Sequence, residues 1–132
     1  MHCQICGRKQ FLRADNTVRL HHVAGDICAG SHYPPIEIDN AWLAEYTARI
    51  AAEHAAARRR LAQLVDARAN FIPPGLETRI AQLALKARRL ARRQRRIETW
   101  PARYEDQMRN RGWADVPPAY LLARYREQRI AA

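Results

Sequence analysis

The sequence predicts a mainly α-helical protein with a small cysteine-containing module at its amino terminus. Two observations predict this fold class. All three cysteines lie within the first 28 residues, and apolar residues recur at helical spacing from about residue 40 onward. We therefore expect three parts: a zinc finger with a short β-hairpin over residues 1–39, an antiparallel α-hairpin or coiled coil over 40–98, and two shorter helices over 99–132.

The cysteines of the amino-terminal module have the spacing of a zinc site. In Cys3-x2-Cys6-Gly7, two thiolates can bind one ion while the glycine allows the chain to turn tightly. Structural zinc takes four Cys or His ligands in a tetrahedron, and Cys28 is the third candidate. An odd number of cysteines argues against a disulfide framework and for a reducing compartment. We predict one structural Zn²⁺ ion.

The fourth ligand must come from one of three histidines. A strand ending at residues 20–22 would point only one of two adjacent histidines inward. We favour His22, with His21 and His32 as alternatives. A module of 39 residues is too small to be stable by hydrophobic burial alone, so its folding should depend on the metal.

The module should also contain a short β-hairpin. Apolar pairs at 11–12 and 18–20 flank Asp15-Asn16, a sequence typical of a turn. Pro34-Pro35 then closes the module before the helices begin.

The first helix is predicted from about residue 40 to 70. Asp39 is a good N-cap, and apolar residues recur from Leu43 to Leu64. Pro73-Pro74-Gly75 breaks this helix, and a second follows. Its apolar positions alternate at spacings of four and three, which is the heptad seam of a coiled coil: Leu76, Ile80, Leu83, Ala87, Leu90, Gln94 and Ile97.

Two shorter helices complete the chain. Thr99 and Pro101 suit the cap and first turn of a third helix, which Gly112 ends. Pro117-Pro118 precedes a fourth. The chain has neither an apolar run of transmembrane length nor the apolar core of a signal peptide, so we expect no membrane association.

The positive charge lies almost entirely on the helical part. The net charge is +10, yet residues 1–39 carry four basic and four acidic residues. Arginine, which accounts for all but two of the 23 basic residues, is suited to bidentate phosphate or carboxylate contacts. The residues predicted to bind a polyanion are Arg58, Arg59, Arg60, Lys86, Arg88, Arg89, Arg92, Arg93, Arg95 and Arg96. We expect the two groups to face one region and form a single surface.

The amino-terminal segment resembles a family of small phage proteins. Cys3-Gln-Ile-Cys6-Gly7-Arg8, then His21-His22, then Cys28-Ala-Gly30-Ser-His32-Tyr-Pro34-Pro35 is similar to the start of mostly uncharacterised bacteriophage and prophage proteins. These carry a CxxCGR knuckle, a histidine-containing strand, a CxGxxxxPPYE-like segment and a helical tail. The resemblance covers about 40 residues and implies zinc ligands and a bacterial host. Because the cysteines indicate a reducing compartment and no signal peptide is present, we expect a cytoplasmic location in the host cell. This chain departs from the pattern in having Ile36 at a usually aromatic position and a shorter loop from His22 to Cys28.

No nucleotide-binding loop, nucleophile motif or paired carboxylates appear in the sequence. We therefore expect a non-enzymatic protein that binds nucleic acid, or an acidic surface of a host nucleic-acid-handling complex, as a regulator or inhibitor. One alternative is a structural protein that forms homodimers through its helical seam. The other is a degenerate HNH-type nuclease, in which His21-His22, Asn40 and His54 follow the order of the catalytic residues.

Overall fold

The computed structural model describes residues 1–132 and is mainly helical. Along the chain come two short strands, β1 (His22–Val23) and β2 (Asp26–Ile27), and four helices: α1 (Ala41–Asp66), α2 (Leu76–Glu98), α3 (Trp100–Arg111) and α4 (Ala119–Ala131). The predicted fold class is confirmed, including the β-hairpin near the amino terminus. None of the four helices combines the length and the apolar content that a membrane crossing requires.

The chain divides into two compact units. The finger unit comprises Met1–Leu43 and Arg95–Ala132, and the hairpin unit comprises Ala44–Gln94. This division differs from the predicted one, because α4 joins the amino-terminal module. The Tyr120 hydroxyl donates to the Ile36 carbonyl at 2.6 Å, and burial of this hydroxyl raises its pKa. Arg124 Nη1 also lies 3.5 Å from Asn40 Oδ1.

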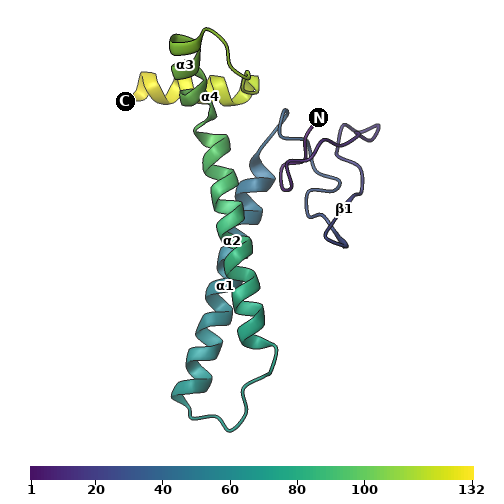
Figure 1. The fold of residues 1–132 in the computed structure, drawn as a ribbon, viewed down its shortest axis with the longest axis vertical. Helices are drawn as coiled ribbons and strands as arrows, with labels where there is room; N and C mark the ends of the chain where they lie inside the picture. Colours follow the sequence, from purple (N-terminus) through teal and green to yellow (C-terminus); the bar gives the residue numbers. More distant parts are fainter. The chain divides into compact units, whose positions relative to one another are not determined.

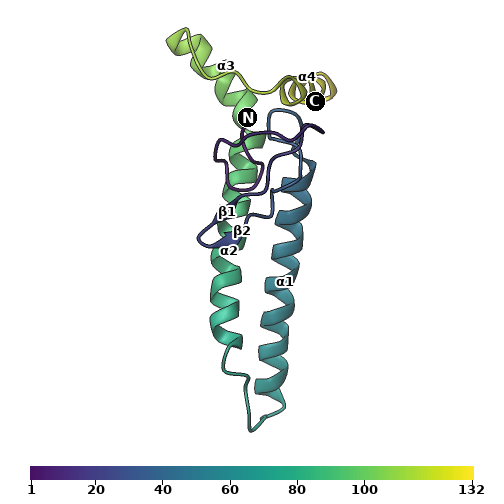
Figure 2. The same ribbon diagram turned by 90° about the vertical axis from the view of Figure 1, so that its right-hand side faces the viewer.

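In the hairpin unit, α1 and α2 run side by side in opposite directions (Figures 1 and 2). The α2 leucines at intervals of seven, Leu76, Leu83 and Leu90, are all buried, and so are Tyr46 and Ile50 on α1. The predicted heptad seam is therefore present. The seam is covered within a single chain, so self-association through it would require the hairpin to open.

Two side-chain contacts define the register of the hairpin. Lys86 Nζ lies 5.1 Å from the centre of the Tyr46 ring, and Arg79 Nη2 lies 3.7 Å from Glu53 Oε2. From the first contact to the second, the chain advances seven residues on α1 and goes back seven residues on α2. A further seven places Arg60 at the level of Ile72, which precedes α2. The last turns of α1 therefore face the connecting loop and not the other helix.

The helix ends follow local chemistry. Asp39 Oδ1 accepts hydrogen bonds from the backbone N–H groups of Asn40 at 2.8 Å and Ala41 at 3.2 Å, and so satisfies the N–H of the first residue of α1. Helix α1 ends four residues before the predicted end, because Arg68 adopts a left-handed conformation with φ of 49°. The backbone N–H of Ala69 then donates to the Leu64 carbonyl at 3.0 Å in a Schellman motif. Arginine at this position gives little warning of a helix end, since glycine usually occupies it.

Gln4 joins the cysteine knuckle to the first turn of α1. Gln4, which lies between the two cysteines of the knuckle, is fully buried although its side chain is polar. Nε2 donates to the Pro34 carbonyl at 2.8 Å, and Oε1 accepts from the backbone N–H of Leu43 at 3.0 Å. A helix leaves its first N–H groups without internal partners, so this contact satisfies a donor that would otherwise be buried and unpaired.

Candidate metal centre

The two cysteines of the knuckle are positioned by a tight backbone turn. The N–H of Gly7 donates to the Cys3 carbonyl at 3.0 Å, and the N–H of Cys3 donates to the Arg8 carbonyl at 3.1 Å. Gly7 has a φ of 73°, which glycine adopts without a steric penalty. The predicted role of this glycine in turning the chain is thus confirmed.

The other two candidate ligands flank the β-hairpin: His21 comes directly before β1, and Cys28 comes directly after β2. Strands β1 and β2 pair antiparallel, with His22 opposite Ile27, across a two-residue turn at Ala24-Gly25. Both turn residues have positive φ, 51° and 85°, as a type I′ turn requires. The N–H of Cys28 donates to the His21 carbonyl at 2.9 Å, so these two residues sit beside each other.

The hairpin expected around Asp15-Asn16 has a weaker form. Leu12 and Val18 make a single antiparallel bridge, with the N–H of Arg13 donating to the Thr17 carbonyl at 2.7 Å. The chain does reverse there, but the paired strands lie at residues 22–27 instead.

The structure gathers four donor atoms at one point. The ligand atoms of Cys3, Cys6, His21 and Cys28 all lie within 4.8 Å of one another. Cys3 Sγ is 3.8 Å from Cys28 Sγ, and Cys6 Sγ is 3.4 Å from His21 Nε2. With Zn–S and Zn–N bonds of about 2.3 and 2.0 Å, the edges of a tetrahedron are about 3.8 Å for S–S and about 3.5 Å for S–N. The donor set and these two spacings both fit a structural Cys₃His metal site.

His21, and not the favoured His22, completes this group. His22 begins β1 and is exposed, because adjacent residues of an extended segment point in opposite directions. His32, the other alternative, is also exposed and lies outside the group. Of the residues in the nuclease alternative, only His21 belongs to it; Asn40 is buried near Arg124, and His54 is a half-buried residue of α1.

Neighbouring groups orient the His21 ring. Its Nδ1 lies 2.8 Å from the Arg19 carbonyl oxygen and 3.3 Å from Ser31 Oγ. A carbonyl can only accept, so the hydrogen is placed on Nδ1 and the Nε2 lone pair is left for a metal ion. This arrangement of a histidine ligand with a carbonyl behind it is common at metal sites.

Gly30 and Trp42 support the site, although neither was predicted to do so. A Cβ atom on Gly30 would lie 2.1 Å from Cys3 Sγ, so no larger residue fits. Trp42 Nε1 donates to the Ala29 carbonyl at 2.8 Å, and its ring stacks on Tyr33 with centroids 4.0 Å apart. The sequence shows the Cys28-x-Gly30 spacing, but the contact of Gly30 with Cys3 depends on packing between residues distant in the chain.

Burial and mutual hydrogen bonds shift the pKa values of the three thiols. A hydrogen bond to Cys28, together with burial, raises the pKa of the Cys3 thiol to about 12. The same hydrogen bond lowers the pKa of Cys28, because it stabilises the Cys28 thiolate. Burial raises the pKa of Cys6 above its ordinary value of 9.0. At neutral pH at least two protons must therefore leave when a metal binds.

Metal affinity should accordingly rise steeply with pH. Protons compete with the metal for Cys3 and Cys6, whose raised pKa values keep both thiols protonated at neutral pH. Two released protons correspond to an affinity gain of about 100-fold per pH unit between pH 6 and 8. Competition titrations with a chromophoric chelator at several pH values would measure this slope. A flat profile would contradict the proposed ligands.

Single substitutions should separate the three histidines. We expect His21→Ala to weaken metal binding by more than about 100-fold, because loss of a residue that only orients a ligand already costs up to about that much. His22→Ala and His32→Ala serve as matched controls and should bind as the wild type does, because both side chains are exposed. Titration with Co²⁺, followed by its d–d absorption, measures all four proteins. An intact spectrum in His21→Ala would exclude this residue as a ligand.

The predicted basic residues occupy two separate places. Arg58, Arg59 and Arg60 are exposed on the part of α1 that faces the loop. Lys86, Arg88, Arg89 and Arg92 are exposed on α2 within the hairpin unit, where Arg93 is half-buried. Arg95 and Arg96 are exposed and belong to the finger unit.

Comparison of the chain with protein-family models, curated proteins and solved structures finds no match.

Proposed function

We propose that this chain is a non-enzymatic zinc-finger protein that binds nucleic acid through its basic helical hairpin. In this proposal it acts on nucleic acid in a bacterial host, as a regulator or inhibitor of phage or prophage origin, and an acidic surface of a host nucleic-acid-handling complex is the alternative target. The charge of the hairpin unit is the observation that carries the proposal. The origin rests only on the resemblance of the first 40 residues.

The hairpin unit concentrates the charge of the whole chain. Residues 44–94 contain eleven basic and four acidic residues, a net charge of +7 out of +10. No acidic residue occurs between Glu77 and Glu98. Arg88 and Arg92 are one turn apart on α2, where like charges repel and destabilise a helix. An acidic ligand would neutralise these charges and remove the repulsion, so binding would stabilise α2.

The separation of the two basic groups favours an extended ligand. Tyr46 on α1 lies at the level of Lys86 on α2. Arg58 follows Tyr46 by twelve residues, which is about 18 Å along α1 at 1.5 Å per residue. The groups therefore do not form the single surface that was predicted, because the loop and not α2 lies opposite Arg58–Arg60. A nucleic acid strand is long enough to contact both groups, whereas a compact anion contacts one.

Zinc is the metal that the donor set favours. Three thiolates and one imidazole in tetrahedral spacing are typical of structural zinc sites, which have no open position for a substrate. The proposed metal therefore supports the fold of the finger unit and takes no part in a reaction.

The salt dependence of binding tests this proposal. Arg88→Gln/Arg89→Gln/Arg92→Gln removes three exposed charges and keeps good helix formers. Each lost phosphate contact lowers the slope of log K against log salt by about 0.7 to 0.9, so the triple variant should lose about 2 to 3. Arg109→Gln/Arg111→Gln/Arg126→Gln, exposed residues of α3 and α4, is the matched control.

Two results would contradict direct nucleic acid binding. One is an affinity that the hairpin substitutions reduce no more than the control substitutions do. The other is salt-independent capture of a single host protein from nuclease-treated lysate. The second result would favour an adaptor that binds an acidic protein surface.

A further inference from the structure

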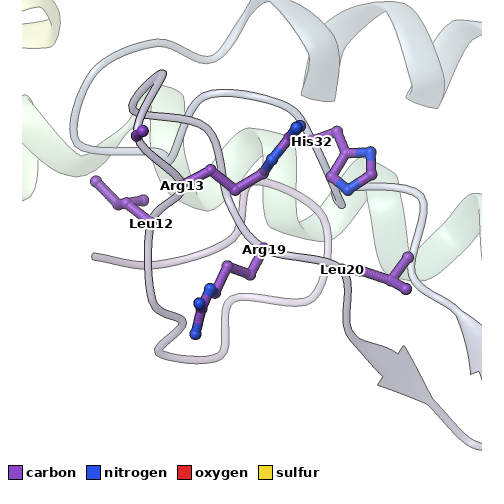
Figure 3. A pocket seen from close by; sticks show the side chains of 6 residues that line it. Leu12, Arg13, Arg19, Leu20 and His32 are labelled. Atoms are coloured by element: carbon purple, nitrogen blue, oxygen red, sulfur yellow. The ribbon is translucent and has the colours of Figure 1, made fainter.

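The finger unit has a basic hollow outside the metal centre. It is shallow and open, has a cavity volume of about 580 Å³, and is lined by Leu12, Arg13, Ala14, Arg19, Leu20 and His32. Figure 3 shows Arg13, Arg19 and His32 around it. The volume lies within the range of roughly 300–1,000 Å³ that is usual for small-molecule sites. No carboxylate lines the hollow.

The backbone pairing beside this hollow determines which side chains face outward. Leu12 bridges Val18, and the N–H of Arg19 donates to the Phe11 carbonyl at 3.0 Å. Side chains alternate between the two faces of such a pair. Val18 is fully buried and Leu12 packs against the finger core, so Phe11, Arg13 and Arg19 share the outward face.

This outward face combines an exposed aromatic ring with two cations. Phe11 is 80% exposed and does not line the hollow, but it lies across from Arg19 and two residues before Arg13, which do. His32 is held alongside because its N–H donates to the Val18 carbonyl at 2.7 Å. The ring of Phe11 thus offers a base a surface for stacking beside two cations.

The arginines of this face are largely available to a ligand. None of the ion pairs of the chain involves Arg19. Arg13 Nη1 lies 3.8 Å from Asp15 Oδ2, but both side chains are about half-exposed. Asp15 is engaged within its own turn, where Oδ1 accepts from the Thr17 hydroxyl at 2.6 Å and from the Thr17 N–H at 3.1 Å.

We propose that this face, formed by Phe11, Arg13, Arg19 and His32, binds a single-stranded nucleic acid. Phe11 stacks on a base, and the two arginines contact the flanking phosphates. The inference rests on the proposed function and extends it by naming the class of nucleic acid. Single strands offer unpaired bases to aromatic side chains, whereas a duplex keeps its bases stacked. An acidic peptide would use the cations and leave the ring of Phe11 without a partner.

Binding of labelled oligonucleotides by the zinc-loaded full chain tests the inference. The ligands are a 12-nucleotide single strand and a 12-base-pair duplex, measured by fluorescence anisotropy. Phe11→Ala should weaken single-strand binding by about tenfold and leave duplex binding unchanged. Arg13→Gln/Arg19→Gln should lower the salt slope for the single strand by about 1.4.

Matched controls separate this face from general charge and from misfolding. Ile130→Ala removes another exposed apolar side chain, 86% exposed on α4, and Arg109→Gln/Arg126→Gln removes two other exposed charges. Both controls should bind close to the wild type. Zinc content and circular dichroism of every variant should match the wild type, since all substituted side chains are exposed.

The outcomes distinguish this inference from the proposed function. If Phe11→Ala binds the single strand as tightly as Ile130→Ala does, the inference is wrong, and loss of binding in the Arg88/Arg89/Arg92 variant would still support the hairpin. If the wild type binds neither nucleic acid, both proposals are wrong. If polyglutamate of equal charge competes as well as the single strand does, the ligand is an acidic protein surface and the inference is overturned.

Discussion

Removal of the metal should unfold the amino-terminal module while most helix in the hairpin unit remains. Two of the three buried residues in the core cluster around the finger are candidate metal ligands, Cys3 and Cys28. The core cluster consists of Cys3, Val18 and Cys28, with half-buried Ile5, Cys6, Leu12 and Val23 around it. Val18 is the only buried residue of this cluster that is not a candidate ligand, and the strands are two residues long. Zinc binding in finger peptides is worth about 10–16 kcal/mol at pH 7, far more than this burial supplies.

The tryptophan signals of the finger unit provide the measurement. Trp42 is buried, stacks on Tyr33 and donates to the carbonyl next to Cys28. We expect a strong zinc chelator to abolish the near-ultraviolet circular dichroism of this pair and to red-shift the Trp42 emission. The 222 nm signal should persist in large part, because the buried seam of α1 and α2 includes no metal ligand.

Readdition of Zn²⁺ is the control for chelation and should restore both tryptophan signals. Purified protein that holds no stoichiometric metal, or a chelated protein with unchanged tryptophan signals, would refute the metal centre. The proposals for the hairpin could then be tested independently, since they depend on the charges of residues 44–94.

Gly30→Ala should disrupt the metal centre as strongly as loss of a ligand. The added methyl group would lie 2.1 Å from Cys3 Sγ, a distance that real Cβ atoms do not show, and in tight contact with the Ile5 side chain at 3.3 Å. Either Cys3 or the chain after Cys28 must move, and three-thiolate geometry cannot survive a shift of that size. Gly30 has no positive φ, so the clash and not backbone strain causes the effect. We expect metal affinity to fall by more than about 100-fold.

A second glycine gives a matched control for this substitution. A Cβ atom on Gly75, just before α2, would meet nothing within 4 Å, and Gly75 also lacks a positive φ. Gly75→Ala should therefore bind metal as the wild type does. Its free energy of unfolding should change little, because the less flexible unfolded chain offsets the loss of a residue favoured at the N-cap. Isothermal titration with Zn²⁺ and thermal unfolding would compare the two variants. Wild-type affinity in Gly30→Ala would mean that Gly30 does not pack on the cysteine.

Local patterns in the sequence were sufficient for much of the fold. The heptad spacing of Leu76, Leu83 and Leu90 identified the seam, and Asp39 and Gly112 marked the ends of helices. Two candidate ligands followed from the Cys-x2-Cys spacing, because a knuckle is built from residues close in the chain, and Cys28 was the one cysteine that remained. The end of α1 was missed, because Arg68 occupies a left-handed position that glycine usually marks.

The sequence by itself determined which elements form and that the cysteines share one centre, since helical periodicity, capping and ligand spacing act over a few residues. The tertiary structure alone decided that His21 faces the cysteines, that Gln4 pairs with α1 and that α4 joins the finger unit. It also separated Arg58–Arg60 from the arginines of α2. These features depend on strand orientation, helix register and contacts between distant residues, which no local pattern specifies.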